Sequence, residues 1–171
     1  MNRPGNFIIQ AFATGGFLSY IPARIFQGWP LTGAGFVGSL LGLAALRYLP
    51  VVPYQQALVL VGTLLISIVI SDRSEQIFRR TDDPRIIIDE FIGYWAAVAF
   101  LPRTVAVIWS AFVLFRLLDS IKPPPIRELG QLPGGWGIVM DDVLAGIVAN
   151  LLIRTIPVSY WMVRTALLKK L

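Results

Sequence analysis

The sequence predicts an all-α polytopic membrane helical bundle with about five apolar helices and an interfacial N-terminal segment. Of its 171 residues, 56% are hydrophobic and 15% are charged, and the mean hydropathy is +0.68. A soluble domain of this size has about a quarter of its residues charged. Apolar stretches of helix length alternate with prolines and charged loops. The length is that of a single domain, which we expect to cover residues 1–171.

The elements follow from these stretches in order. Residues 7–34 combine glycines and prolines with scattered aromatic residues, which predicts a short helix and irregular structure at the membrane interface. Apolar helices are expected over residues 35–49, 54–71, 86–101, 104–121 and 141–156, and a last apolar segment over 158–168. Gly38 and Gly42 are four residues apart and would allow close helix packing in a bilayer, and Asn150 is expected to form a hydrogen bond between helices.

Two residue types are missing from the sequence, and their absence narrows the chemistry. Without cysteine, disulfides, thiolate metal sites and cysteine nucleophiles are excluded. Without histidine, Ser-His-Asp triads, phosphohistidine intermediates and histidine-bound zinc are excluded. Catalysis would therefore depend on carboxylates, Arg, Lys, hydroxyls, backbone amides and a hard metal ion.

In three of the expected helices, the uncharged stretch is too short to cross a bilayer. Residues 91–101, 104–115 and 143–153 are uncharged, and each stretch has only 11 or 12 residues, whereas a span needs about 20. These helices cross a bilayer only if their charged ends lie at headgroup depth. The ends carry three clusters, namely Asp89-Glu90, Arg116/Asp119/Lys122 and Asp141-Asp142. Ionisable groups at that depth are a functional hypothesis by default.

The charge distribution predicts an orientation. Alternating spans put all three clusters on one face, together with most of the arginines and lysines that flank the helices; only Arg47 and Arg103 fall in the opposite loops. The positive-inside rule makes the charged face cytoplasmic. The net charge of +5 is explained by these flanking residues, and no nucleic-acid partner is expected. The sequence does not orient residues 157–171.

The clusters have the composition of a magnesium-dependent phosphoryl site. Carboxylates suit a hard cation, and cationic side chains suit phosphate oxygens. Arg116, Asp119 and Lys122 are spaced three apart and share one helix face. The Gly134-Gly135 turn could bring backbone amides close to a phosphate.

Structural explanations stand beside this hypothesis. Asp141 or Asp142 could be a helix N-cap, Arg116 and Asp119 could form an ion pair between helices, and Asp89-Glu90 could complement a helix dipole. The remaining acids are interpreted as solvated loop charges, with Asp82 or Asp83 capping the third helix; they are Asp72, Glu75, Asp82, Asp83 and Glu128.

Three stretches resemble the phosphatidylglycerophosphatase A family. They are Asp-Pro-Arg-Ile-Ile-Ile-Asp-Glu-Phe-Ile-Gly at 83–93, Phe-Arg-Leu-Leu-Asp-Ser-Ile-Lys-Pro at 115–123 and Gly-Gly-Trp-Gly-Ile-Val-Met-Asp-Asp at 134–142. The resemblance implies a multi-pass lipid phosphatase of the bacterial cell inner membrane with its active site facing the cytoplasm. It would use Mg²⁺ to remove the terminal phosphate of phosphatidylglycerophosphate and release phosphatidylglycerol.

The resemblance also implies site residues. The catalytic and metal-binding acids would be Asp89, Glu90, Asp119, Asp141 and Asp142. The phosphate-binding residues would be Arg116 and Lys122, with Gly134, Gly135 and Ser39 as further donors. One departure is that Phe36 stands where the family has threonine, in the segment Ala-Gly-Phe-Val-Gly-Ser at 34–39.

Two other functions compete with this one. A small transporter or channel subunit could use the acids as an ion path, but its acids would be spread through the bilayer depth, whereas here they cluster at one end. A CDP-alcohol phosphotransferase also depends on magnesium and aspartate, but its Asp-Gly-x-x-Ala-Arg signature is missing. The oligomeric state is not predicted.

Overall fold

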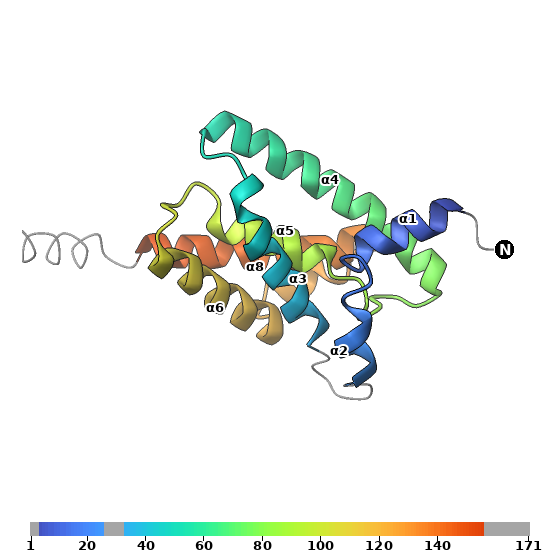
Figure 1. Cartoon of the computed structure of the whole chain (residues 1–171). Coiled ribbons are helices and arrows are strands. Elements are labelled where there is room, and N and C mark those ends of the chain that lie inside the picture. Colours follow the sequence, from blue (N-terminus) through green and yellow to red (C-terminus); the bar gives the residue numbers. More distant parts are fainter. Residues whose placement is uncertain (1–3, 26–32, 156–171) are drawn as a thin grey trace, which may run out of the picture.

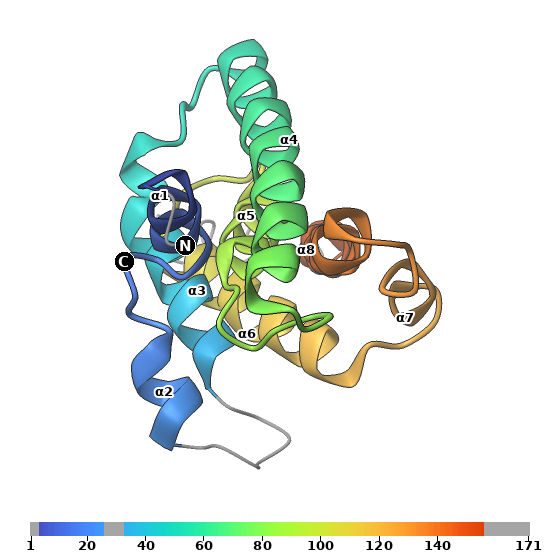
Figure 2. The same ribbon diagram turned by 90° about the vertical axis from the view of Figure 1, so that its right-hand side faces the viewer.

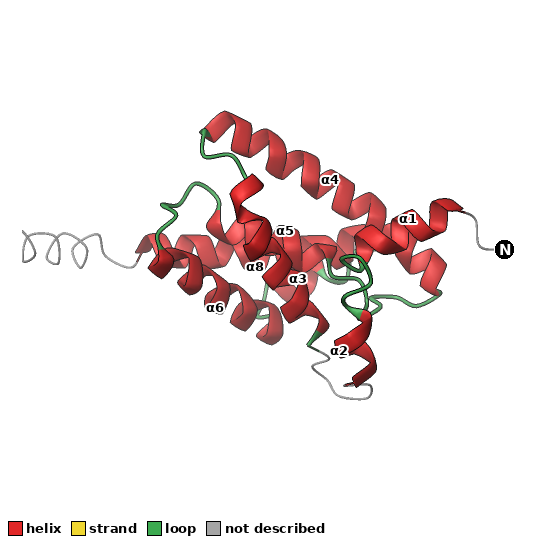
Figure 3. Cartoon of the chain, in the orientation of Figure 1, coloured by secondary structure: helices red, strands yellow, loops and turns green. Residues whose placement is uncertain are grey.

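The computed structural model describes residues 4–25 and 33–155, which are helical with connecting turns and contain no strand (Figure 3). The predicted all-α class is confirmed. In chain order the elements are α1 (Pro4–Ala13), α2 (Tyr20–Ile25), α3 (Ala34–Ala44), the 3₁₀-helix η1 (Ala45–Tyr48), α4 (Pro53–Phe78), α5 (Ile88–Val98), α6 (Val105–Ile121), α7 (Ile126–Leu129) and α8 (Gly135–Thr155) (Figure 1).

Two helix boundaries differ most from those predicted. Helix α4 continues seven residues beyond Ser71, so that Asp72 and Glu75 lie on its last turns and not in a loop. Helix α8 begins at Gly135, six residues before Asp141. Neither Asp141 nor Asp142 is therefore an N-cap. The expected apolar segment at 158–168 lies outside the described residues.

The predicted count of five spanning helices is not confirmed. Among the described residues, only α4, with 26 residues, and α8, with 21, are long and apolar enough to cross a membrane. Helices α5 and α6 have 11 and 17 residues, and a span takes about 20.

Large apolar side chains nevertheless cover the outside of the bundle. On α4, Leu58 is 70% exposed and Val69 is 60% exposed, and similar residues cover the outer faces of α1 and α6. Exposed apolar surface on this scale indicates contact with a membrane or a partner. Together with the two long apolar helices, it indicates that the protein associates with a membrane.

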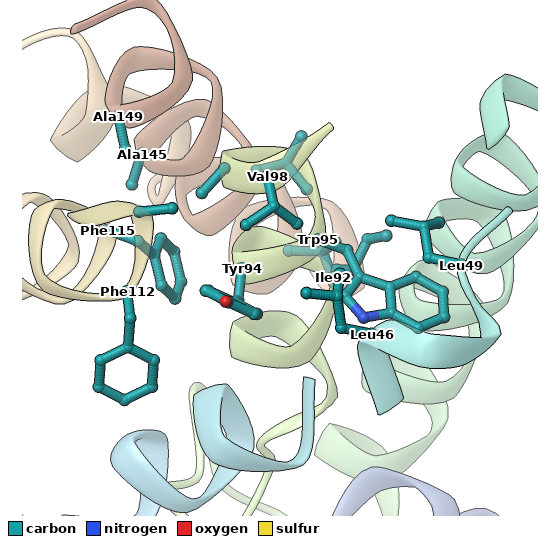
Figure 4. Close-up of a cluster of buried hydrophobic side chains, with 14 of the residues drawn as sticks. Leu46, Leu49, Ile92, Tyr94, Trp95, Val98, Phe112, Phe115, Ala145 and Ala149 are labelled. Carbon is teal, nitrogen blue, oxygen red and sulfur yellow. The ribbon is translucent and has the colours of Figure 1, made fainter. Parts of the chain in front are cut away.

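Helix α5 is the centre of the bundle. It contacts α3, α4, α6 and α8, which surround it in Figure 2. Its side chains Ile92, Tyr94 and Trp95 are buried in a core that extends to Phe115 on α6 and Ala145 on α8 (Figure 4). Because α5 carries Asp89 and Glu90 in its first turn, this packing fixes the backbone that presents both carboxylates.

Helices α5 and α8 run parallel in close contact. A Cβ added to Gly146 would lie 2.1 Å from the backbone oxygen of Gly93, and only glycine allows such an approach. The same register repeats along the pair, since Asn150 Nδ2 donates to Ala97 O at 3.0 Å and the Asp142 carboxylate lies beside that of Asp89. In each of the three pairs, the α8 residue lies 53 positions after its partner.

Helix α3 also runs parallel to α5 in glycine-mediated contact. A Cβ on Gly38 would lie 2.6 Å from Ile87 O, and one on Gly42 would lie 3.0 Å from Phe91 O. The indole of Trp95 donates to Gly42 O at 2.9 Å. The predicted close packing at Gly38 and Gly42 is confirmed. Helices α3, α5 and α8 thus begin at the same end of the bundle.

Polar side chains close the opposite end of the bundle. Asn150 donates to Ala97 O and Ala99 O, which confirms its expected role between helices, and Arg154 donates to Asn150 Oδ1 at 2.7 Å. Arg103 donates to the carbonyls of Leu46 and Pro50. These bonds satisfy carbonyls that helix C-termini leave free, so caps stabilise the described part of this end.

The loop before α5 contains an ion pair between a buried acid and a half-buried arginine. Asp83 is 3% exposed, and its carboxylate accepts hydrogen bonds from Arg85 Nε at 2.7 Å and Nη2 at 2.8 Å. The Arg85 guanidinium also lies 4.1 Å from the Phe78 ring centroid, and Arg85 O accepts a hydrogen bond from Ser19. The prediction that Asp83 is a solvated charge or a helix cap was wrong, because Arg85 folds back over it while it contacts Phe78 of α4 and Ser19 in the turn before α2.

We predict that Gly146→Ala prevents stable folding or lowers the melting temperature strongly, because the added Cβ meets backbone atoms of α5 that cannot yield. Overpacking of this kind costs about 1–3 kcal/mol or more. The matched control is Gly62→Ala on α4, where a Cβ meets nothing within 4 Å. Alanine there should be neutral or stabilise by up to about 1 kcal/mol. Equal melting temperatures for both variants in detergent would contradict the close contact.

We further predict that Asp83→Asn lowers the free energy of unfolding by about 2 kcal/mol, the scale of hydrogen bonds to a charged group. Burial disfavours the Asp83 carboxylate, yet the hydrogen bonds and charge of Arg85 hold its pKa below the ordinary value. The contribution is therefore present at neutral pH and is lost as the pH falls below about 4. Melting curves of variant and parent should converge at acid pH; a constant difference from pH 7 to pH 3 would exclude this ion pair as the cause.

Candidate active site

A pocket opens where α5 and α8 begin and α6 ends. Its volume is about 640 Å³. Its lining combines apolar side chains, among them Phe36 of α3 and Val113 and Leu117 of α6, with the charged side chains of Asp82, Asp89, Glu90, Arg116, Asp119, Lys122 and Asp142. The three clusters that the sequence places at one depth thus converge on one cavity.

Three acids form a compact group in this pocket. Asp89, Glu90 and Asp142 each offer a carboxylate oxygen, and these oxygens lie within 4.8 Å of one another. Asp89 and Asp142 are 7% and 2% exposed. Within the described chain, no hydrogen-bond partner reaches Asp89 Oδ1, Glu90 Oε2 or Asp142 Oδ2. Buried carboxylate oxygens without partners are costly, and the group has the ligand type and spacing that suit a hard divalent cation.

The other two predicted acids are paired with cations. Asp119 Oδ2 lies 2.8 Å from Arg116 Nη1, one helical turn away on α6. Asp141 Oδ2 accepts a hydrogen bond from Lys122 Nζ at 2.5 Å, and its other oxygen accepts one from the Asp142 backbone amide at 2.9 Å. The Arg116–Asp119 pair lies within α6 and does not join two helices as the structural alternative assumed. The five acids therefore divide into three with free oxygens and two that position cations.

Lys122 lines the pocket and has an unusual backbone conformation. It ends α6 in the left-handed region, with φ of 45°, a conformation uncommon for residues other than glycine. Its ammonium lies 3.9 Å from Asp119 Oδ1 in addition to its bond with Asp141. Burial disfavours the charged ammonium, but the nearby carboxylates of Asp142, Asp141 and Asp119 raise the Lys122 pKa above its ordinary value. The side chain remains a cation at physiological pH.

A side chain of α3 contacts the Arg116 guanidinium. Its Nη1 lies 3.4 Å from Ser39 Oγ, which itself donates to Gly35 O. Ser39 is fully buried and does not line the pocket. It therefore contacts Arg116 from the protein interior and not from the cavity. A Cβ on Gly35 would lie 2.2 Å from Glu90 Oε1. Glycine at this position leaves room for the Glu90 carboxylate.

Gly134 and Gly135 are not brought into the pocket. A Cβ on Gly135 would lie 2.0 Å from Ile68 O of α4, and the Gly135 amide donates to Asp72 Oδ1 at 3.4 Å. Gly134 has φ of +60° and also faces Asp72. These glycines allow α8 to start directly against α4. The Gly135 amide binds a carboxylate of the protein itself and not a ligand in this cavity.

The apolar lining of the pocket and the contact between Gly35 and Glu90 were not predicted from the sequence. Phe36 and Phe112 meet edge to face at 5.4 Å between ring centroids, and Val113 and Leu117 lie beside Arg116 on α6. The spacing of Val113 and Leu117, one helical turn apart and next to a site residue, was a usable signal. The contact of Gly35 with Glu90 had no signal in the sequence, because it depends on the register between α3 and α5.

Comparison with known proteins relates the chain to lipid phosphatases. The sequence model of the family described as phosphatidylglycerophosphatase A matches residues 11–157. A phosphatidylglycerophosphatase A from Haemophilus influenzae is 42% identical over 83 residues, or 47% of this chain and 50% of that protein. One from Escherichia coli is 34% identical over 119 residues, or 67% of this chain and 69% of that protein.

A third relative has a different name. A Bacteroides thetaiotaomicron protein whose name proposes phosphatidylinositol-3-phosphatase activity is 36% identical over 85 residues, or 48% of this chain and 52% of that protein. The chain thus spans about half the length of the Bacteroides and Haemophilus relatives. No solved structure matches it. Since the family match covers most of the chain, including every charged residue of the pocket, this protein belongs to the phosphatidylglycerophosphatase A family.

Proposed function

We propose that the protein is a magnesium-dependent lipid phosphatase. It hydrolyses the terminal phosphomonoester of phosphatidylglycerophosphate to phosphatidylglycerol and phosphate, as a step of glycerophospholipid biosynthesis. The observation that carries the proposal is the group of free carboxylate oxygens of Asp89, Glu90 and Asp142 next to the cations Arg116 and Lys122 in one pocket. The family match supports the substrate class.

The proposed roles follow from the partners of each side chain. Asp89, Glu90 and Asp142 would hold Mg²⁺, since their oxygens are close together and lack hydrogen-bond donors. Such an ion, when bound, supplies positive charge that stabilises phosphate oxygens in the transition state. One of these three carboxylates accepts the proton of the attacking water.

Two cations would bind the phosphate of the substrate. Arg116 presents a planar guanidinium that suits two phosphate oxygens, and Asp119 and Ser39 fix its position. Lys122 provides a second charge, oriented by Asp141. In this assignment Asp119 and Asp141 are positioning residues. The acids lie at one end of the bundle, which supports an enzyme site and not a transporter path through the bilayer.

The proposed setting is the bacterial inner membrane, with the pocket facing the cytoplasm. Arginines at the end of the bundle that contains the pocket support this orientation; they include Arg73, Arg79, Arg80, Arg85 and Arg127. The opposite end has Arg47, Arg103 and Arg154, of which Arg103 and Arg154 donate to backbone carbonyls. The single domain over residues 1–171 is part of the same proposal.

A substrate panel tests the reaction directly. Purified protein should release phosphate from phosphatidylglycerophosphate faster than from phosphatidic acid or phosphatidylinositol 3-phosphate, and a chelator should abolish release from all three. The phosphatidylinositol lipid is included because of the Bacteroides relative. Preference for that lipid would overturn the proposed substrate but would still be consistent with a lipid phosphatase. Phosphate release that a chelator does not affect would overturn the metal-dependent mechanism.

A metal-binding prediction tests the acidic group. Saturating Mg²⁺ should raise the melting temperature of the parent, because an ion at 100 times its Kd stabilises by about 2.7 kcal/mol. Asp142→Asn should lose most of this shift and lower kcat by about 100-fold or more, while its melting temperature without Mg²⁺ equals or exceeds that of the parent, since a like charge is removed.

The matched control is Glu128→Gln, which removes an exposed carboxylate of α7 outside the pocket. It should keep both the Mg²⁺ shift and the activity. A double variant Asp141→Asn, Asp142→Asn with full activity would rule out the metal site. Loss of the Mg²⁺ shift in Glu128→Gln would mean that the ion binds elsewhere.

A further inference from the structure

The apolar side of the pocket continues onto the outer surface of the bundle. Phe36 on α3 and Val113 and Leu117 on α6 line the cavity, yet they are 49%, 52% and 51% exposed. Each therefore faces both the pocket and the surroundings of the protein. The edge of the cavity on α3 and α6 is therefore formed by exposed apolar side chains.

The exposed residues on α6 form a continuous row. Trp109, Val113, Leu117 and Ile121 follow one another every four residues and are all at least half exposed, so they lie along one face of the helix. From Leu117 to Trp109 the row extends about 12 Å along the helix axis. It leads from the charged end of the pocket toward the middle of the bundle.

The wall beside this row is formed by aromatic side chains that pack against one another. The Phe36 ring meets Phe112 edge to face at 5.4 Å, and Phe112 meets Trp109 at 5.8 Å. Phe112 itself is buried. The aromatic contacts tie Phe36 of α3 to α6. Phe36, Val113 and Leu117 line the same cavity, and together they are called the groove.

Charged and apolar residues alternate on neighbouring positions of α6. Arg116 is paired with Asp119 within the charged side of the pocket, whereas its neighbour Leu117 is half exposed beside it. A ligand that contacts both must have a phosphate at one end and a hydrocarbon chain adjoining it. A phospholipid has this structure, whereas a soluble phosphate ester would leave the groove uncovered.

We propose that the groove of Phe36, Val113 and Leu117 binds an acyl chain of the substrate lipid and that the lipid reaches the acids laterally, between α3 and α6. This inference rests on the proposed phosphatase function and specifies how its lipid is bound. The groove makes the rate depend on acyl-chain length, since a chain too short to reach Val113 leaves the apolar surface uncovered.

Selective loss of long-chain activity is the first test. Val113→Trp fills the groove, and kcat/KM for phosphatidylglycerophosphate with long acyl chains should fall about tenfold or more, with a clearly smaller fall for the dihexanoyl form. The matched control is Val61→Trp on α4, because Val61 is 55% exposed and lies outside the pocket. It should change neither value. Equal losses for both substrates in Val113→Trp would overturn the proposal.

Photocrosslinking gives a readout that does not require turnover. The probe is a phosphatidylglycerophosphate analogue with a photoreactive group in the middle of one acyl chain, in vesicles of neutral phospholipid. Labelling should concentrate on the peptide that contains Val113 and Leu117 and should compete with unlabelled substrate. Equal labelling of α4 around Val61 would show non-specific contact with bilayer lipid and overturn the groove.

Two further outcomes are distinguishable. If the parent releases no phosphate from any lipid but labelling of α6 still competes with substrate, the proposed catalysis fails and the lipid groove stands. The sequence has no cysteine, so the variant Val113→Cys can be spin-labelled at that position alone. Strong dipolar coupling between two labelled molecules across this position would show that a second copy of the chain covers the groove, which would overturn the proposal.

Discussion

The contact between Gly93 and Gly146 determines most of the site. A Cβ on Gly146 would overlap the α5 backbone, so the two helices approach more closely than any other residue would permit. Because they run parallel in one register, this contact places Asp142 beside Asp89 one turn toward the pocket and Asn150 beside Ala97 one turn toward the opposite end. A wider spacing between the helices would both separate the Asp89 and Asp142 carboxylates and break the hydrogen bonds of Asn150.

The charges around the pocket oppose one another in a specific way. Asp119 and Asp141 neutralise Arg116 and Lys122 and hold them in place, whereas Asp89, Glu90 and Asp142 repel one another with free oxygens. Burying such a group costs stability unless a cation is bound. The uneven pairing is therefore better explained by ligand binding than by folding, since the two cations nearest to the group already have other carboxylates as partners.

The sequence predicted the helices better than their ends and roles. Long apolar runs bounded by prolines predicted the elements. Gly134-Gly135 was interpreted as a turn, whereas α8 already begins at Gly135, where a Cβ would meet Ile68 O of α4. Asp83 was interpreted as solvated because nothing in the sequence shows Arg85 folding over it. The positions of the charged clusters identified Asp89, Glu90, Asp119 and Asp142 but missed Asp82, which also lines the pocket. The division into paired and unpaired acids could not be predicted, because it depends on which helices touch.

Helix length and side-chain direction together explain why this pocket would suit a lipid. Helix α5 is too short to span a bilayer and begins with two acids, so its charged end lies within the bundle next to the long helices α4 and α8. On α6, Arg116 and Asp119 face the other acids, and Val113 and Leu117 face outward beside them. A polar site that opened only toward water would need no such apolar margin. The margin instead joins the charged pocket to the exposed apolar surface along a single helix.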